Sequence, residues 1–428
     1  MKGFKAIKKY DLEDDPESPE NGKFSRQGRI PGWQQEIIKH STVIVTGAGA
    51  IGNETLKNLA LLGFGNIFIC DMDTIETSNL TRTVLFTQND VGKKKAKLAA
   101  ERVREINLED TACVDYFDGD IVYGLGDGVF RKADIVLGCL DNAETRMYVN
   151  KICMRYDIPY IDASIGGLNF TVDIMNGHQT GCFECNAPKY KFEKRFRESC
   201  DVAKRKALEQ GFIPTVQTAS AAVSGLQVQQ ACKILCDINP SYGVEIYMNG
   251  ALDMMYRFPI EIDENCRQHQ LDARYVIIET PFSCDNTLRE FLEYTAKDGY
   301  DELMLDEETD KSFITTVRCP NCGKEKKIFQ PQHLVFTDDY YCDDCIARKE
   351  YGENYINEPK DVSLSKLPLD STDPEILDLP MRALGIPPFH VVPVRSAETH
   401  SRRYYELSAD YDAIMPEYSR KHRKYNEK

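Results

Sequence analysis

The sequence lacks any apolar run long enough to cross a bilayer, which takes about 20 consecutive apolar residues. Its first 23 residues are charged and contain no apolar core of the kind that a signal peptide needs. It also lacks an excess of positive charge, because 53 Lys and Arg stand against 68 Asp and Glu, a formal net charge of -15. Nucleic-acid binding depends on Lys and Arg that neutralise phosphates. We therefore expect a cytoplasmic protein that binds neither a membrane nor nucleic acid.

Cysteine, in contrast, is abundant, with 15 residues in a chain of 428. In a reducing compartment, cysteines are not expected to build a disulfide framework. They serve instead as metal ligands, as a nucleophile or as small core residues. The length allows one large domain with one or two small ones.

Continuous apolar runs alternate with helical patterns in the first half of the chain. The runs TVIVTG, NIFICD, ADIVLGC and PYIDASI have the character of buried parallel strands. Amphipathic or helical spacing marks IGNETLKNLALLG, which ends at Gly63, and VGKKKAKLAAERVREIN. This β-α-β order predicts an α/β fold with a doubly wound, mostly parallel sheet of the Rossmann type.

Shifts in composition divide the rest of the chain. Residues 1–25 are polar and acidic, which predicts a flexible lead-in. We expect a main domain over residues 26–272, with a charged crossover at 186–213. A smaller α+β domain is expected over 273–415, and residues 416–428 are expected to form a basic, frayed tail.

Three glycines form a G-x-G-x-x-G pattern between the first expected strand and the first expected helix. They are Gly47, Gly49 and Gly52. Without side chains, the backbone can approach a phosphate closely, and the helix N-terminus offers free N–H groups. The pattern by itself is typical of a dinucleotide site, or simply of a tight turn.

The charged residues that follow point to a triphosphate. Asp71 ends the second strand, where a carboxylate can accept hydrogen bonds from ribose hydroxyls. Asn79, Arg82 and Lys95 come next, and cations of this kind neutralise phosphates and departing pyrophosphate. Asp141 ends a later strand, where a carboxylate can hold Mg²⁺ beside phosphates.

The blocks GAGAIGNETLKNLALLG, DMDTIETSNLTR, DVGKKKA and GCLDN occur in an order that resembles the ThiF/MoeB/HesA family, which includes the ubiquitin-activating enzymes. The resemblance covers roughly residues 25–270. It implies a homodimeric adenylation domain that uses ATP and Mg²⁺ on a protein tail ending in Gly-Gly. It assigns the ribose to Asp71, the phosphates to Asn79, Arg82 and Lys95, and the metal ion to Asp141.

The resemblance also covers Arg26, which lies in SRQGR. In the family this arginine reaches into the ATP site of the other subunit, so a monomer is expected to be impaired. The chain has no long inserted cysteine domain, and in this it resembles prokaryotic members more than the large eukaryotic ones.

Two cysteine-rich sets have the spacing of zinc ligands. The C-x2-C pair of Cys182 and Cys185 and the later Cys266 and His269 form a Cys₃His set. Their long separation fits the family, although His269 departs from its usual fourth cysteine. The second set has zinc-ribbon spacing over 319–345 and consists of Cys319, Cys322, Cys342 and Cys345. We expect structural Zn²⁺ at both sites.

One cysteine is a candidate nucleophile. Cys200 lies in RFRESCDVAKRK, where neighbouring cations favour the thiolate. Thioester-forming relatives carry their cysteine in this region. An idle, partly exposed cysteine is the alternative. We expect Cys139, Cys232 and Cys236 to be core residues, and Cys284 has no informative context.

The sequence therefore predicts an ATP-dependent enzyme that adenylates the terminal glycine of a ubiquitin-like protein and transfers it to Cys200. A conjugating enzyme would then receive the product, with the second domain recruiting one of these partners. Three alternatives remain: an activator of a sulfur-carrier protein without a thioester, an enzyme that adenylates a short peptide, and a NAD-binding or catalytically silent scaffold subunit. Intact Arg82, Lys95 and Asp141 argue against the last.

Overall fold

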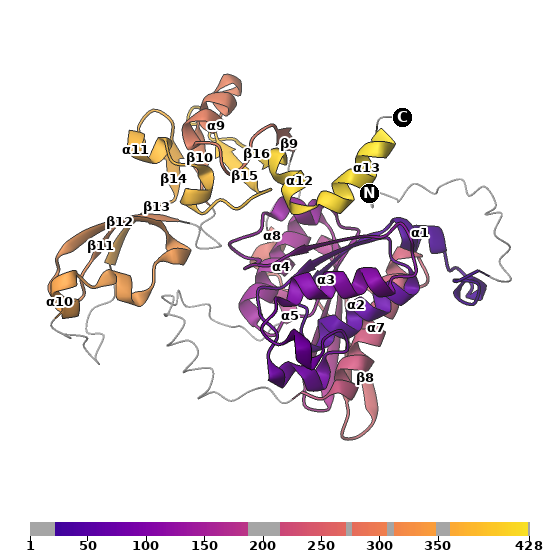
Figure 1. Cartoon of the computed structure of the whole chain (residues 1–428). Coiled ribbons are helices and arrows are strands. Elements are labelled where there is room, and N and C mark those ends of the chain that lie inside the picture. Colours follow the sequence, from indigo (N-terminus) through magenta and orange to yellow (C-terminus); the bar gives the residue numbers. More distant parts are fainter. Residues whose placement is uncertain (1–21, 187–214, 271–275, 306–311, 348–359, 427–428) are drawn as a thin grey trace.

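The computed structural model describes residues 22–186, 215–270, 276–305, 312–347 and 360–426. The expected lead-in and nearly all of the charged crossover lie outside these residues. Three sheets organise the described chain (Figure 1). Among the described residues, no helix combines the length and the apolar character needed to cross a membrane.

The main sheet has eight strands in the order β3-β2-β1-β4-β5-β6-β7-β8. The strands from β3 to β5 are parallel, whereas β6, β7 and β8 pair antiparallel. The sheet confirms the expected α/β fold. Its strands are β1 (Thr42–Thr46), β2 (Asn66–Cys70), β3 (Cys113–Phe117), β4 (Ile135–Gly138), β5 (Pro159–Gly166), β6 (Asn169–Asn176), β7 (Val244–Asn249) and β8 (Met254–Pro259).

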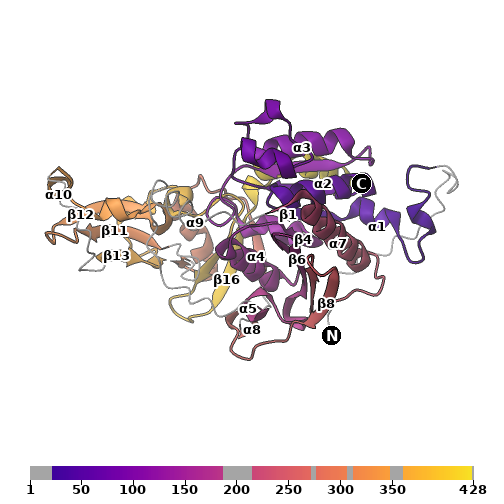
Figure 2. The same ribbon diagram turned by 90° about the horizontal axis from the view of Figure 1, so that it is seen from below.

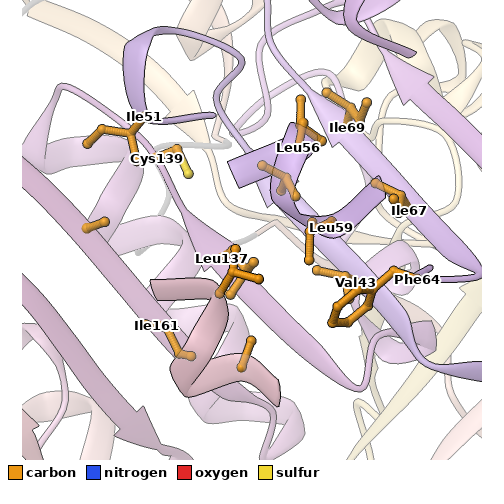
Figure 3. Close-up of a cluster of buried hydrophobic side chains, with 14 of the residues drawn as sticks. Val43, Ile51, Leu56, Leu59, Phe64, Ile67, Ile69, Leu137, Cys139 and Ile161 are labelled. Atoms are coloured by element: carbon orange, nitrogen blue, oxygen red, sulfur yellow. The ribbon is translucent and has the colours of Figure 1, made fainter. Parts of the chain in front are cut away.

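Helices cover both faces of this sheet. α2 (Ala50–Leu62), α3 (Lys95–Ile106) and α7 (Gln217–Leu235) pack on one face, and α4 (Ala143–Tyr156) packs on the other. Side chains from β1, α2, β2, β4 and β5 interdigitate in the first of these layers (Figure 3). Val43, Leu59 and Leu137 are fully buried there. Burying one such side chain contributes about 1.5–3 kcal/mol, so this layer fixes the strand ends that carry the site.

A second, five-stranded sheet has the order β14-β10-β15-β16-β9, with β9 parallel to β16 and the other pairs antiparallel. Helix α9 (Leu288–Thr295) begins with a reciprocal capping box between Thr287 and Glu290 and packs its apolar face on this sheet. The strands are β9 (Ile277–Thr280), β10 (Glu302–Met304), β14 (Lys366–Pro368), β15 (Val391–Arg395) and β16 (Arg402–Leu407).

The third sheet has three antiparallel strands in the order β12-β11-β13 and lies at one end of the molecule (Figure 2). Its strands are β11 (Phe313–Arg318), β12 (Glu325–Pro331) and β13 (Lys360–Leu364), and α10 (Asp343–Ala347) lies beside the cysteines of the expected ribbon. In sequence, this sheet is inserted between β10 and β14 of the second sheet.

Short helices complete the described chain. They are η1 (Gln27–Arg29), α1 (Gln35–His40), η2 (Thr77–Arg82), η3 (Gln88–Asp90), η4 (Asp127–Lys132), η5 (Gly177–Gln179), α5 (Phe183–Asn186), α8 (Arg267–Gln270), η6 (Ala296–Asp298), η8 (Gln332–Leu334), η9 (Thr337–Tyr340), α11 (Pro374–Leu377), η10 (Met381–Leu384), η11 (Ser408–Asp410) and α12 (Tyr411–Ile414).

The expectation of a frayed C-terminal tail is wrong for most of that segment, because α13 (Pro416–Asn426) is a helix that packs on strand β3 (Figure 1). Asp115 on β3 accepts backbone hydrogen bonds from Glu417 (3.2 Å) and Tyr418 (3.0 Å). In return, the Glu417 carboxylate accepts one from Val114 N (3.0 Å). These bonds satisfy first-turn N–H groups that a helix leaves unpaired, so α13 also covers the edge of the main sheet.

A buried charged cluster joins the main sheet to the second sheet. Asp127, at the start of η4, is 1% exposed. Its carboxylate accepts hydrogen bonds from Arg155 (2.8 Å), Tyr156 (2.8 Å) and Val391 N (2.9 Å), and His390 Nδ1 lies 3.0 Å away. Burial alone would raise the pKa of Asp127, but His390 and Arg155 hold it well below its usual range. The carboxylate is therefore charged and shared by both sheets.

We expect Asp127→Ala to lower the free energy of unfolding by about 3–5 kcal/mol, because it leaves buried cations without their partner. Urea unfolding followed by circular dichroism measures this change. The matched control is Asp298→Ala, which removes an exposed pair with Arg403 at 3.3 Å and should cost no more than about 1 kcal/mol. Equal effects of the two substitutions would contradict a structural role for Asp127.

Candidate active site and metal centres

The glycine turn between β1 and α2 lies against the end of β4. Gly47 has a positive φ of 96°, and a Cβ there would lie 2.4 Å from the carbonyl oxygen of Cys139. A Cβ on Gly52 would lie 2.0 Å from the carbonyl oxygen of Gly47. Both positions therefore require glycine for packing within the chain. A Cβ on Gly49 would meet nothing within 4 Å, and Gly49 and Ala50 at the N-terminus of α2 are partly exposed.

Asp71 follows β2 and contacts the glycine turn directly. Its carboxylate accepts hydrogen bonds from Ala48 N (2.7 Å) and Asp73 N (2.8 Å). Burial raises the pKa of Asp71, although Lys95 and these two N–H groups act in the opposite direction. The structure thus places Asp71 beside the glycine turn that precedes α2.

Lys95 begins α3 and points back toward the same edge. Its side chain is only 10% exposed, and its ammonium lies 2.8 Å from the Asp73 carboxylate, which is 54% exposed. A largely buried cation paired with an accessible acid can exchange that partner for a phosphate. Lys95 N also donates to Asp73 O at 3.0 Å, which ties the start of α3 to the loop after β2.

Asn79 and Arg82 lie together on η2. Asn79 Oδ1 accepts a hydrogen bond from Glu76 N (2.9 Å), and Arg82 Nη1 donates to Ser78 O (2.7 Å). Both side chains are half-buried. The segment after η2 is anchored to the glycine turn by Asn53, which accepts from Leu85 N (2.9 Å) and donates to Ala48 O (2.6 Å).

Asp141 lies in the loop after β4 and is exposed. Its Oδ1 is 3.5 Å from Asn142 Nδ2. An accessible carboxylate at this edge suits Mg²⁺, which usually takes one or two carboxylates plus substrate phosphates. Arg146 anchors this loop to β5, because its guanidinium donates to the carbonyl oxygens of Leu140 (Nε, 3.1 Å) in the loop and Ala163 (3.3 Å) on β5.

Sequence reasoning missed several positioning residues. Gln227 is fully buried on α7 and donates to the carbonyl oxygens of Gly138 and Ile161, each at 2.9 Å. It also accepts a hydrogen bond from Thr55 (2.9 Å) on α2. An amide at an apolar position of an expected core helix was the available signal, because a buried amide needs partners. Gln227 thereby fixes β4 and β5 beneath the site.

Arg26 and the cysteines outside the two expected zinc sets remain to be located. Arg26 lies just before η1 and is exposed. Cys200 lies outside the described residues, so its role stays a prediction. Cys139, Cys232 and Cys236 are buried as expected, and Cys284 is buried too.

The first cysteine set forms a compact tetrad. Cys182 Sγ lies 3.8 Å from Cys185 Sγ and 3.6 Å from Cys266 Sγ, and Cys185 Sγ lies 3.6 Å from His269 Nδ1. Tetrahedral Zn²⁺ with bonds of about 2.0–2.3 Å separates its ligands by roughly 3.5–3.8 Å, so the set fits. His269 Nε2 is 2.9 Å from the Thr180 carbonyl oxygen, which can only accept. Nδ1 therefore keeps its lone pair for a metal.

The second set also converges. The ligand atoms of Cys319, Cys322, Cys342 and Cys345 lie within 4.8 Å of one another, with Cys322 Sγ and Cys342 Sγ 3.5 Å apart. Both tetrads have four protein ligands, which leaves no open position for catalysis and suits structural zinc. The zinc sites expected from the cysteine spacing are thus matched by geometry.

We expect the purified protein to contain two equivalents of zinc by elemental mass spectrometry. His269→Ala should lose one equivalent and Cys322→Ser the other, because each tetrad needs its fourth ligand for tight binding. A double variant should contain none. Retention of two equivalents in either single variant would show that its tetrad is not a zinc site.

A second missed feature is the buried carboxyl of Asp173 on β6. Burial, together with the charges of Asp162 and Glu245, raises its pKa to about 8. The folded chain therefore holds this proton more tightly than the unfolded chain does, and stability falls as pH rises from about 4 to about 8.

Asp173→Asn should remove that loss, which is on the order of a few kcal/mol. We expect the variant and the parent to have similar free energies of unfolding near pH 4, and the variant to have the larger one at pH 8. Urea unfolding at both pH values measures this. Glu101→Gln, which changes an exposed carboxylate on α3, serves as the control. A constant difference between parent and variant across this range would contradict the raised pKa.

The chain is similar in sequence to several known proteins. Among curated proteins, the SUMO-activating enzyme subunit 2 of Dictyostelium discoideum is 40% identical over 149 residues, which is 35% of this chain and 22% of that protein. Protein HesA of Leptolyngbya boryana is 30% identical over 172 residues, or 39% of this chain and 61% of that protein. The chain thus spans less than two thirds of the length of either relative.

Among solved structures, Escherichia coli MccB with ATP gives a TM-score of 0.48 at 23% identity, covering 59% of this chain and 76% of that one. Residues 24–268 match the model of the ThiF family. This match covers more than half of the chain and contains the glycine turn, Asp71, Arg82, Lys95 and Asp141. The chain belongs to the ThiF family.

Proposed function

We propose that this protein adenylates the C-terminal carboxylate of a ubiquitin-like protein that ends in Gly-Gly. The observation that carries the proposal is the gathering of Asp71, the accessible N-terminus of α2 and two cations at the carboxyl edge of the main sheet. The names of the curated relatives support it, because they include SUMO-activating and ubiquitin-activating enzymes.

In the proposed reaction, ATP lies across the glycine turn with its ribose on Asp71. A phosphate replaces the Asp73 carboxylate as the ion-pair partner of Lys95, and the phosphates also contact Arg82 and Asn79. Asp141 would hold Mg²⁺, which supplies charge neutralisation at the phosphates. The substrate carboxylate is already ionised and needs no general base, so the chain contributes positioning and positive charge.

The proposed reaction has two steps, adenylation and thioester formation. A carboxylate oxygen bonds to the α-phosphorus, and the bond to the bridging oxygen breaks, so pyrophosphate leaves with the electron pair. In the second step we propose that the Cys200 thiolate attacks the acyl carbon and AMP departs, leaving a thioester. This step rests on the sequence around Cys200 and on the family. Without it, the chain would be a sulfur-carrier or peptide activator of the same family.

The wider assignments belong to the same proposal. We propose a cytoplasmic homodimer in which Arg26 completes the other subunit's nucleotide site. The domain division at residues 26–272 and 273–415 follows the separation of the main sheet from the other two. In this proposal the second part recruits a conjugating enzyme or the ubiquitin-like protein, and its zinc ribbon is a structural support.

ATP–pyrophosphate exchange tests the first step. We expect exchange only when a ubiquitin-like protein ending in Gly-Gly is supplied, and a loss of about 10²–10³-fold in Lys95→Ala or Arg82→Ala, since each removes charge stabilisation from the transition state. Lys97→Ala, an exposed neighbour on α3, should retain exchange. Unchanged pyrophosphate exchange in Lys95→Ala and Arg82→Ala would contradict the proposed nucleotide site.

Cys200→Ala separates the thioester step from adenylation. The variant should keep pyrophosphate exchange while losing an adduct that dithiothreitol releases, as seen on a non-reducing gel. If the adduct persists, the nucleophile is another residue. If the parent forms no adduct but still exchanges pyrophosphate, the chain ends its reaction at the adenylate.

A further inference from the structure

One sulfur atom of the second tetrad belongs to a residue that is open to solvent. Cys319, Cys342 and Cys345 are 2%, 3% and 4% exposed, whereas Cys322 is classed with the exposed residues of the chain. Cys322 Sγ lies 3.5 Å from Cys342 Sγ. An accessible cysteine therefore has the sulfur of a buried cysteine directly beside its own.

The first tetrad is shielded on all of its members. Cys182 and Cys266 are buried and pack with Met154 in one cluster, and Cys185 is half-buried. The fourth member, His269, is half-buried as well, and an imidazole does not form a disulfide. The two tetrads thus offer similar ligands to a metal ion but differ in how easily a solute can reach a sulfur.

The second tetrad lies at the outer end of the third sheet. Strand β11 begins at Phe313, which is buried in the core of the second sheet, and it ends one residue before Cys319. Cys322 lies in the turn between β11 and β12. Helix α10, which contains Cys345, is at the end of the molecule (Figures 1 and 2). The sulfur atoms are therefore at the end of this sheet that points away from the second sheet.

This placement makes Cys322 open to oxidation. A cysteine that binds zinc is a thiolate, and thiolate character together with exposure decides which cysteines peroxides oxidise. Hydrogen peroxide is small and uncharged. The exposed ion pair of Lys324 and Asp344 (3.0 Å), close to the turn, is therefore no barrier to it. Within the two tetrads, Cys322 is the ligand that combines a thiolate with full access.

We propose that Cys322 is a site of oxidation by peroxides, and that its oxidation releases zinc from the second tetrad. The Cys322 sulfur attacks one peroxide oxygen, the O–O bond breaks, and hydroxide leaves with the electron pair, so that a sulfenic acid forms. The Cys342 thiolate then attacks the Cys322 sulfur, the S–O bond breaks, and a second hydroxide leaves. Two sulfur atoms have lost two electrons to the peroxide, and a disulfide joins Cys322 to Cys342.

The disulfide removes two of the four thiolates, and the ribbon has little else to hold it together. Its own apolar cluster has four buried members, which are Ile314, Val317, Val335 and Tyr340. Domains with so small a core depend on a bound metal for their fold. We therefore expect the outer end of the third sheet to lose its order on oxidation. A thiol reductant and fresh zinc reverse the change, so the ribbon is a reversible, oxidant-sensitive switch.

The inference does not rest on the proposed function, because zinc release is measured without nucleotide or partner protein. The full-length chain, loaded with two equivalents of zinc, is treated with about 1 mM hydrogen peroxide. A chromogenic zinc chelator follows the release. One equivalent should leave at least tenfold faster than the other, since only the second tetrad has an exposed thiolate. Dithiothreitol followed by ZnCl₂ should restore both equivalents.

Cys322→His assigns the fast release to this residue. The variant has a Cys₃His set like the first tetrad, so it should keep two equivalents of zinc, but it cannot form the disulfide. Its fast phase should slow at least tenfold. Cys284→Ala, which changes a buried cysteine outside both tetrads, should release zinc as the parent does.

Two further measurements on the parent chain decide the inference even if Cys322→His fails to hold two equivalents. Alkylation with iodoacetamide and peptide mapping should find a disulfide between Cys322 and Cys342 after peroxide treatment. Trypsin should then cleave faster after Lys327, which lies on β12, because an ordered strand resists proteolysis.

Several outcomes would overturn the inference. They are a second tetrad that contains no zinc before treatment, equal release from the two tetrads, no release within an hour, and a disulfide map in which Cys322 is still a free thiol. A Cys322→His variant that holds two equivalents and releases one as fast as the parent would overturn it too.

Discussion

The close backbone approach between the glycine turn after β1 and the end of β4 is the constraint on which the candidate active site depends. Neither Gly47 nor Gly52 has room for a Cβ, because carbonyl oxygens lie 2.4 Å and 2.0 Å from where it would be. The turn is further held by Gly47 N, which donates to Cys70 O at 2.7 Å. Three strand ends are thus brought together, and the loops that carry Asp71 and Asp141 leave the sheet at one edge.

The charges around this edge are satisfied within the chain by partners that are more exposed than the cations themselves. The Lys95 ammonium pairs with the Asp73 carboxylate, and the Arg82 guanidinium donates to the main-chain carbonyl of Ser78. In the proposed reaction a phosphate replaces Asp73 beside Lys95 and the Ser78 carbonyl beside Arg82. No buried carboxylate is left unpaired, since the Asp73 side chain is 54% exposed and is solvated by water. The same logic does not apply to Asp127, which is buried from every side and serves the junction between two sheets. The Lys95–Asp73 pair can therefore open at little cost in free energy, whereas opening the Arg155–Asp127 pair is costly. The difference comes from the exposure of the acid, which is high for Asp73 and low for Asp127.

Much of the parallel half of the sheet could be predicted from the sequence. Runs such as TVIVTG and NIFICD are buried on both faces, and the helix between them ends at Gly63, as its pattern indicates. The cysteine tetrads could also be predicted, because each half-site has a local C-x2-C or C-x2-H spacing. The pairing of Cys182 and Cys185 with Cys266 and His269, which are distant in sequence, followed from the family resemblance. Strand β6 was not predicted, since Asp173 interrupts its apolar pattern. Helix α13 was not predicted either. Its sequence is basic and poor in apolar residues, and its partner Asp115 lies about 300 residues earlier.

Asp162, Asp173 and Glu245, which are paired across β5, β6 and β7, show how the first cysteine tetrad and the candidate active site are connected. Asn186, which holds Asp173 and Glu245, is the last residue of α5 and directly follows Cys185. The first tetrad therefore fixes the amide over the acids, although it takes no part in chemistry. A fold that needed only stability would replace Asp173 with an apolar residue, because a buried carboxyl without a donor is costly. Arg146 places a cation at one end of this set of acids, 3.4 Å from Asp162, and the raised pKa of Asp173, about 8, keeps that carboxyl protonated near neutral pH, so that no more than two of the three neighbouring acids are charged.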